Sequence, residues 1–205
     1  LYLIYLGFTL LEVIFLLFGG NSFYDSLVTS LATAGTGGFG IYNDSIASFN
    51  SYSQIVIGVF MLIFGINFNI FYLILIGRIA QAFKSEELRW YVGIIVFSVV
   101  AIAINLTLSM EYAFHIALKD SFFQVSSIIT TTGFATADFN LWPNLSKCIL
   151  LILMFVGACA GSTGGGMKVS RFVILFKSLK REIKKLVHPN SVSNITFEGS
   201  TVDEN

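Results

Sequence analysis

The sequence has few charged residues. Only 12% of its 205 residues are Asp, Glu, Lys or Arg, whereas a soluble domain carries about 25%. The mean hydropathy is +0.80, and 55% of the residues are hydrophobic. This composition argues against a soluble globular domain and predicts a polytopic membrane protein. The formal net charge is zero; it identifies no partner, and we expect no nucleic-acid binding.

Cysteine and histidine are also scarce. Cys148 and Cys159 both lie in an apolar stretch, so we expect small buried side chains rather than a disulfide. Two histidines leave little for a metal site. No basic segment or small-residue cleavage site precedes the first apolar run, so we expect a membrane span rather than a signal peptide. The sequence opens within this run at Leu1, and we expect it to be part of a longer protein.

Two short Thr/Gly runs interrupt the apolar sequence. The first Thr/Gly loop covers residues 36–39 (TGGF) and the second Thr/Gly loop covers residues 131–134 (TTGF). Asp25 stands thirteen positions before Gly38, and Asp120 stands thirteen positions before Gly133. A fixed offset of 95 residues therefore relates the two segments, which indicates internal duplication.

The composition of these loops favours an ion pathway. Glycine beside small polar residues lets the backbone turn its carbonyl oxygens toward a ligand. At membrane depth, irregular backbone is tolerated only where protein or a water-filled cavity surrounds it. Carbonyl-lined loops of this kind replace the hydration shell of an ion in selectivity filters. We interpret the pair as two pore loops of a cation pathway.

The apolar pattern predicts an all-α protein with four spans. Spans of sufficient length are expected at residues 1–18, 54–83, 92–109 and 145–177. Short helices at residues 26–34 and 121–130 rise only about 15 Å, half a membrane, and lead into the Thr/Gly loops. A unit of span, pore helix, filter loop and span is thus expected in residues 1–83 and again in 90–177. A charged cytoplasmic loop, residues 84–89, is expected between them.

Several polar and aromatic residues carry local expectations. Glu12 lies in mid-span and should face protein or water, either as a packing residue or as a functional one. Ser22 or Asp25 is expected to cap the first short helix. Trp90 and Tyr91 are expected at the membrane interface.

Charge predicts the orientation. Residues 168–188 hold seven Lys or Arg residues and one Glu, a net charge of +6. The return loops after the Thr/Gly loops carry Asp44 and Asp138 and no basic residue. The positive-inside rule then places residues 178–205, a basic segment and polar tail, in the cytoplasm and both pore loops outside, so the two units are parallel. The basic run 177–185 is interpreted as a lipid headgroup contact, a solvated helix end or a docking surface.

A Gly-rich segment breaks the last span. It consists of Gly161, Ser162, Thr163, Gly164, Gly165 and Gly166. A nucleotide-binding P-loop is disfavoured because no Ser or Thr follows Lys168. A helix-packing surface is one alternative. The favoured interpretation is an unwound segment that occludes the pathway and moves aside as a gate. Lys168 and Arg171 would follow on its cytoplasmic side or extend to the lipid headgroups.

Three longer stretches contain these motifs: SLATAGTGGFG (30–40), ITTTGFATADFNLWP (129–143) and GACAGSTGGGMKVSRFVILFK (157–177), and the basic KREIKKLVHP (180–189) continues the last one. They resemble the Trk/Ktr/HKT family of potassium transporters, in particular its TrkH branch. The resemblance spans essentially the whole sequence. It implies four pore repeats around one pore in the cell (inner or plasma) membrane, of which these would be the second and third. The first and fourth repeats are missing from this sequence.

The resemblance also implies a site and partners. The potassium filter would be lined by backbone carbonyls of Thr36, Gly37, Gly38, Thr131, Thr132 and Gly133, and residues 161–166 would form the gating loop. K+ would be the transported ion, with no organic cofactor. Family members assemble in the lipid membrane as homodimers on a cytoplasmic ring of nucleotide-binding, TrkA/KtrA-like regulatory subunits.

Two other classes of function remain as alternatives. A secondary carrier for another small solute would also use broken helices, although such carriers usually show inverted repeats. A membrane-embedded hydrolase would have to use His115, Asp120, Ser162 or Glu12, and the sequence suggests no nucleophile–base pair among them.

Overall fold

The computed structural model describes residues 2–187, 195–198 and 200–201. These residues are mostly helical, in agreement with the predicted all-α class. The helices are α1 Tyr2–Phe18, α2 Phe23–Ala34, α3 Ser51–Phe64, α4 Phe68–Leu75, α5 Ile79–Lys84, α6 Glu86–Met110, α7 Phe114–Ile129, the 3-10 helix η1 Phe139–Leu141, α8 Asn144–Val156 and α9 Val169–Val187. Two short strands, β1 Thr196–Phe197 and β2 Ser200–Thr201, pair antiparallel. The remainder of the basic segment and tail, including Pro189, lies outside the described residues.

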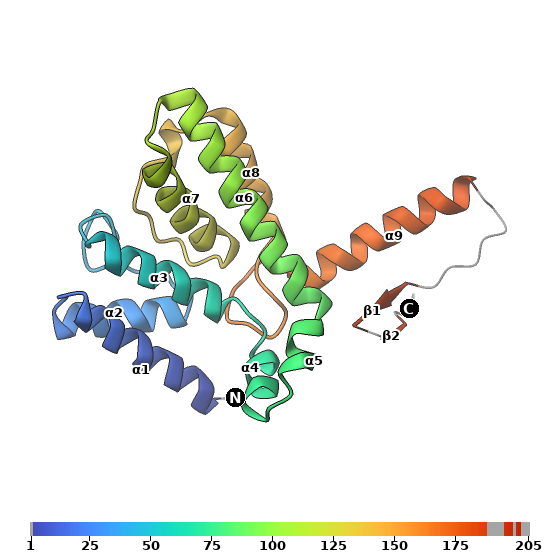
Figure 1. Ribbon diagram of the computed structural model, residues 1–205, viewed down its shortest axis with the longest axis horizontal. Helices are drawn as coiled ribbons and strands as arrows, with labels where there is room; N and C mark the ends of the chain where they lie inside the picture. Colours follow the sequence, from blue (N-terminus) through green and yellow to red (C-terminus); the bar gives the residue numbers. More distant parts are fainter. Residues whose placement is uncertain (1, 188–194, 199, 202–205) are drawn as a thin grey trace.

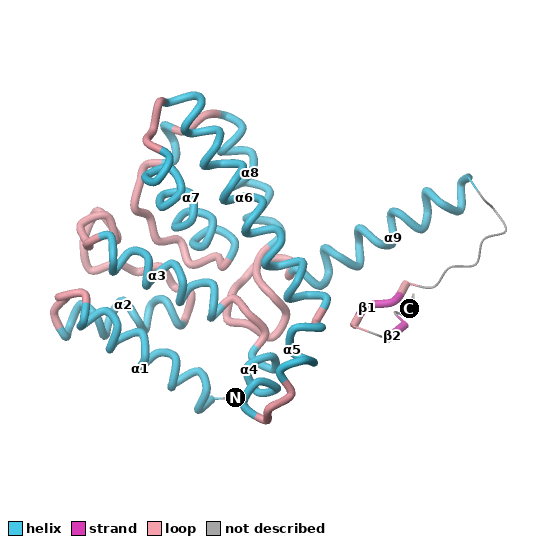
Figure 2. The backbone as a smooth tube through the Cα atoms, in the orientation of Figure 1, coloured by secondary structure: helices cyan, strands magenta, loops and turns pink. Residues whose placement is uncertain are grey.

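Six of the helices form two groups of three. Helices α1, α2 and α3 pack together, and so do α6, α7 and α8. Helix α3 packs on α7 and joins the groups, while α9 extends away from both of them (Figure 1). The loop between α8 and α9 lies near the centre of the molecule, between the two groups (Figure 2).

The two short helices differ in length. Helix α2 begins after Ser22, whose side chain accepts a hydrogen bond from the Asp25 backbone N–H (3.1 Å), so Ser22 is the cap and Asp25 lies in the first turn. Helix α7 begins at Phe114, earlier than the predicted Ser121. No side-chain hydrogen bond caps α7 at Ala113, so no capping residue marks this start in the sequence.

The predicted span 54–83 is not one continuous element. Helix α3 ends at Phe64 and α4 begins at Phe68, with a bend of 90° between them. Gly65 ends α3, and the Asn67 side chain caps α4 by accepting a hydrogen bond from the Asn69 backbone N–H (3.0 Å). Gly65 and Asn67 therefore mark a full break in the predicted span.

The prediction of a charged loop at residues 84–89 is wrong. Helix α5 runs to Lys84 and α6 begins at Glu86, with only Ser85 between them. Glu87 is buried instead of standing in water, and so is Tyr91, whose hydroxyl donates to the Leu62 carbonyl (3.3 Å). Glu87 and Tyr91 are four residues apart, so they share the inner face of α6. Trp90 is exposed, as an interface residue would be.

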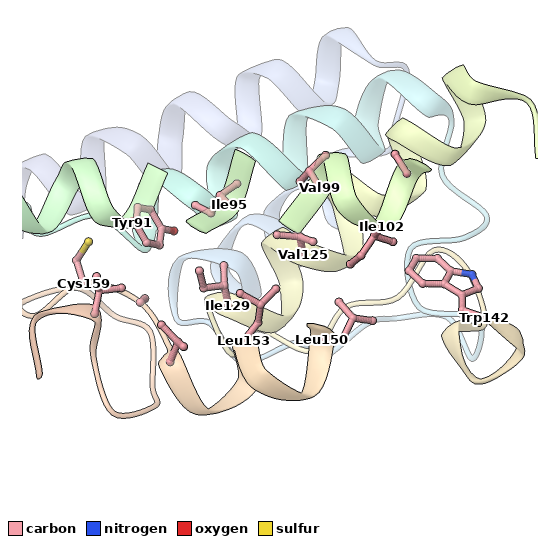
Figure 3. Packing of buried hydrophobic residues seen from close by; sticks show 14 of the residues in the cluster. Tyr91, Ile95, Val99, Ile102, Val125, Ile129, Trp142, Leu150, Leu153 and Cys159 are labelled. Carbon is pink, nitrogen blue, oxygen red and sulfur yellow. The ribbon is translucent and has the colours of Figure 1, made fainter. Parts of the chain in front are cut away.

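The largest apolar core lies between α6, α7 and α8 (Figure 3). Its labelled members are Tyr91, Ile95, Val99 and Ile102 of α6, Val125 and Ile129 of α7, and Leu150 and Leu153 of α8, with Trp142 and Cys159 at the two ends. Both cysteines are free; Cys159 is buried as predicted, but Cys148 is exposed because α8 turns it away from this core. Helix α6 is apolar on its outer side too, with Val96, Phe97 and Val100 exposed.

The described residues contain one helix, α6, that is long and apolar enough to cross a bilayer. A second crossing is obtained if the bent pair α3 and α4 counts as one span. Helices α1 and α8 are apolar but shorter, with 17 and 13 residues.

A second apolar cluster joins the two helix groups. The first group contributes Leu16, Ile46, Phe49, Ile57 and Met61, and the second contributes Phe123 and Phe134. Phe134 follows Gly133 of the second Thr/Gly loop, and its side chain is 2% exposed. The ring thus anchors one group to the core of the other.

We expect Phe134→Ala to lower the free energy of unfolding by about 3 kcal/mol, because it leaves a cavity in this shared core. The measurement is the apparent melting temperature of the detergent-purified full-length protein. Phe97→Ala is the matched control, since Phe97 is exposed on α6. Equal melting temperatures for the two variants would contradict the anchoring role of Phe134.

Candidate functional site

The two Thr/Gly loops have the same unusual backbone. Thr36 and Gly38 have positive φ (47° and 66°), and so do Thr131 and Gly133 (57° and 90°). Positive φ is uncommon for threonine, a β-branched residue, so its occurrence at both positions is informative. The offset of 95 residues that relates the two sequences therefore also relates these conformations.

Equivalent hydrogen bonds hold both loops to the ends of their helices. Each loop follows a helix, α2 or α7, whose last carbonyls accept two backbone N–H groups of the loop. The bonds are Thr36 N to Thr33 O (3.0 Å), Gly37 N to Ala32 O (2.8 Å), Thr131 N to Ile128 O (3.1 Å) and Thr132 N to Ser127 O (2.9 Å). Donors and acceptors in the second loop are again offset by 95 residues from those in the first.

The two Thr/Gly loops are in direct backbone contact. A Cβ atom on Gly38 would overlap the Thr132 carbonyl oxygen, so only glycine fits here. Farther along, the Ile46 N–H donates to the Ala135 carbonyl (3.2 Å), and the Ala135 N–H donates to the Ser45 hydroxyl (3.2 Å). The structure therefore brings the two sets of predicted filter residues together.

The Gly-rich loop, defined here as residues 157–168, connects α8 to α9. It is wider than the predicted break at 161–166. Its ends meet, because the Val169 N–H donates to the Ala158 carbonyl (3.0 Å) and the Met167 N–H to the Phe155 carbonyl (3.2 Å). Compact loops with closed ends are often functional.

The Gly-rich loop lies directly against both Thr/Gly loops. The Thr36 hydroxyl donates to the Thr163 carbonyl (3.1 Å), and the Thr131 hydroxyl accepts from the Gly165 N–H (2.7 Å). A Cβ atom on Gly164 would stand 3.0 Å from the Thr130 carbonyl oxygen. The predicted filter and gate residues are therefore one hydrogen-bonded assembly.

The same loop occupies the break between α3 and α4. The Cys159 N–H donates to the Gly65 carbonyl (3.0 Å), and the Phe68 N–H donates to the Gly161 carbonyl (3.2 Å). These bonds satisfy backbone groups that the break would otherwise leave unpaired. The bend in the first helix group and the loop of the second therefore depend on each other.

Two charged side chains bind backbone groups of the Gly-rich loop. The Lys168 ammonium donates to the Gly164 carbonyl, so Lys168 binds the loop rather than extending to headgroups. The Glu87 carboxylate accepts from the Ala160 N–H (2.7 Å) and the Ser170 N–H (3.2 Å). Sequence reasoning missed Glu87 because it was assigned to a loop in water. The signal that points to it is its spacing of four residues from Tyr91, which places both side chains on one face of a helix.

The candidate groups of the hydrolase alternative do not come together. The Ser162 hydroxyl donates to the Cys159 carbonyl (2.6 Å), and Asp120 pairs with Lys119 (3.6 Å). The oxygens of Glu12 have no hydrogen-bond partner in the described part of the chain. That part also contains no cluster of three His, Cys, Asp or Glu side chains that could hold a metal ion.

Comparison with known proteins decides the family. The model of the TrkH family, described as a cation transport protein, matches residues 1–205. This chain belongs to the TrkH family. It is 37% identical over 207 residues to the Trk system potassium uptake protein TrkH of Escherichia coli (strain K12), covering 100% of this chain and 43% of that protein. It is 33% identical to TrkG of the same strain, over 90% of this chain and 39% of TrkG.

A solved structure of a TrkH family member agrees in fold. The crystal structure of the potassium transporter TrkH from Vibrio parahaemolyticus superimposes with a TM-score of 0.93 at 33% identity, covering 98% of this chain and 44% of that chain. This chain thus spans less than half the length of the TrkH relatives it matches. The TrkH family consists of cation transport proteins, so the comparisons do not support the hydrolase alternative.

The role of Glu12 is open to a direct test. Its side chain is fully buried in α1, as expected for a carboxyl group that faces protein. We expect Glu12→Gln to keep the expression yield and monodispersity of the full-length protein, because the amide fills the same volume without a charge to desolvate. We expect Glu12→Lys to abolish both, since it buries an unpaired cation. A Glu12→Gln variant that fails to fold would show that the carboxyl group does more than pack.

Proposed function

We propose that this chain forms two consecutive pore units of a potassium uptake pathway in a cell membrane. The observation that carries the proposal is the backbone contact between the two Thr/Gly loops, Gly38 against Thr132. Both loops are predicted filter segments, and the named relatives are potassium uptake proteins. Potassium is the transported ion, and its movement is passive, down the electrochemical gradient.

In the proposed mechanism, backbone carbonyls replace the water around the ion. Thr36, Gly37 and Gly38 supply oxygens from one unit, and Thr131, Thr132 and Gly133 supply them from the other. The sign of φ alternates along the first loop, positive at Thr36 and Gly38 but not at Gly37, which supports a backbone that can present carbonyls to a shared axis. Helices α2 and α7 both end at the loops, where their partial negative charge favours a cation.

The contact between the units can repeat around a ring. In the second unit Phe134 is buried in the core of the first unit, whereas its counterpart Phe39, 95 residues earlier, is 79% exposed. Conversely, Gly38 meets Thr132, whereas nothing lies within 4 Å of a Cβ placed on its counterpart Gly133. Within the described part of the chain, the first unit thus has a largely exposed Phe39, and the second unit has a Gly133 whose Cβ position no other backbone approaches. A head-to-tail contact of this kind closes into a ring when further units are added, consistent with four repeats around a pore.

The Gly-rich loop acts as the gate in this proposal. It contacts the first residue of each Thr/Gly loop, Thr36 and Thr131, and therefore occupies the inner end of the filter. Opening requires these two hydrogen bonds to break and the loop to move away from both Thr/Gly loops. The glycines at 164–166 make the rearrangement of its backbone inexpensive.

The proposed setting follows from charge. The basic helix α9 lies on the cytoplasmic side and the return loops that carry Asp44 and Asp138 lie outside, in a multi-pass arrangement. The protein works as a homodimer in the lipid membrane with a cytoplasmic, nucleotide-binding, TrkA/KtrA-like regulatory subunit. The basic run 177–185 is the surface for that subunit.

The function is tested by rubidium uptake in a potassium-transport-deficient host that expresses the full-length protein. We expect potassium to compete with rubidium for uptake. Sugars and amino acids should not compete, whereas a carrier for such solutes would show competition by them. We expect Gly38→Ala to reduce this uptake to the host background, because the added Cβ displaces the Thr132 carbonyl. Gly133→Ser should relax selectivity or abolish uptake, because a side chain at φ 90° strains the backbone.

The control is Gly93→Ala, since nothing lies within 4 Å of the added Cβ on α6. Wild-type uptake and selectivity in Gly38→Ala and Gly133→Ser, at matched membrane expression, would refute a filter built from these loops.

The ring arrangement makes a separate prediction for Phe39. In the full-length protein Phe39→Ala should lower the free energy of unfolding by about 3 kcal/mol, as expected for a buried Phe, because another pore unit covers its ring. The melting temperature is compared with those of Phe134→Ala and Phe97→Ala. A value that matches the exposed Phe97→Ala control would argue against a ring of repeated contacts.

A further inference from the structure

Glu87 is the charged side chain that joins both ends of the Gly-rich loop. Its carboxylate accepts from the backbone N–H of Ala160, near the start of the loop, and of Ser170, just after its end. The side chain is 4% exposed. A carboxylate is costly to bury without partners, so these two N–H groups contribute to its stability there.

The bond to Ser170 has a specific electrostatic origin. Ser170 lies in the first turn of α9, where backbone N–H groups have no partner within the helix. A negative charge beside these groups is favourable because the helix N-terminus carries partial positive charge. Glu87, on α6, therefore supplies from another helix the partner that the first turn of α9 needs.

The bond to Ala160 fixes the other end of the loop. Cys159, the preceding residue, is fully buried in the core and donates its N–H to the Gly65 carbonyl. A single carboxylate oxygen thus joins the start of the Gly-rich loop to the start of α9. The neighbouring Cys159 N–H joins the loop to the break between α3 and α4. Charge-assisted hydrogen bonds of this type are about twice as strong as neutral ones.

We propose that Glu87 is a positioning residue of the gate, whose carboxylate holds the Gly-rich loop against the Thr/Gly loops in the occluding position. The proposal rests on the gating role proposed above. Moving the loop away from the Thr/Gly loops displaces Ala160 relative to Ser170, and one oxygen cannot then keep both bonds. Weakening the acceptor therefore favours the displaced loop.

The test measures the reactivity of Cys159 in the full-length protein, in a background where Cys159 is the sole cysteine. Labelling by a water-soluble thiol reagent reports displacement of the loop, because Cys159 is fully buried when the loop is in place. We expect the labelling rate to rise about tenfold or more in Glu87→Ala, which loses both charge-assisted bonds. Glu87→Gln keeps an oxygen acceptor without the charge and should give an intermediate rate.

The gradation separates positioning from packing. Gln has nearly the shape of Glu, so a side chain that only fills space would give wild-type labelling in Glu87→Gln. Glu86→Gln is the matched control, because it removes the same charge from the adjacent residue. Glu86 pairs with Lys177 (2.6 Å) and not with the loop. We expect labelling within about twofold of wild type there, because the ion pair of Glu86 does not involve the Gly-rich loop. If Glu87→Ala does not fold, the test is the comparison of the Cys159 labelling rates of Glu87→Gln and Glu86→Gln.

Rubidium uptake by the same variants distinguishes the two proposals. We expect higher uptake in Glu87→Gln than in Glu86→Gln, since the loop occludes less. Unchanged Cys159 labelling in Glu87→Gln, in a protein that still takes up rubidium in competition with potassium, would overturn the role of Glu87 alone. Absence of potassium-competed uptake in the wild-type protein would instead overturn the proposed function.

Discussion

The structure depends on the close packing of three glycine-containing loops. The first Thr/Gly loop meets the second at Gly38, and the Gly-rich loop reaches both through Thr163 and Gly165. A side chain at Gly38 would hold the two Thr/Gly loops apart, so the absence of a Cβ there permits their contact. The hydroxyls of Thr36 and Thr131 then bind the Gly-rich loop. Other parts of the fold hold these loops, from the last carbonyls of α2 and α7 to the Phe134 ring in the opposite core.

This constraint links parts of the chain that lie far apart in the sequence. The break between α3 and α4 provides carbonyl and N–H partners for the Gly-rich loop, and the loop satisfies the break in return. Glu87, at the start of α6, connects the same loop to α9. Helix α9, which extends away from the body (Figure 1), is therefore tied through Glu87 to the Gly-rich loop at Ala160.

Local patterns in the sequence were sufficient for the elements that carry a chemical signal. The offset of 95 residues predicted two loops of one kind, and the glycines predicted the break before α9. The start of α7 was missed because no side chain caps it. Glu87 and Tyr91 were placed in water and at the interface because a charged run before an aromatic pair suggests a loop, whereas their burial depends on tertiary contacts with residues 62 and 160. Cys148 was expected inside because composition alone does not tell which face of an apolar helix meets the core. The contact between the Thr/Gly loops was not predictable either, since spacing in the sequence does not encode which backbones touch.

The central claim is that main-chain oxygens of the two Thr/Gly loops bind the transported ion. It is tested most directly by anomalous diffraction from crystals of the full-length protein grown in rubidium. The proposal predicts a rubidium peak coordinated by backbone carbonyls of residues 36–38 and 131–133. A peak coordinated only by side chains elsewhere, with none at these loops under conditions that support transport, would contradict it.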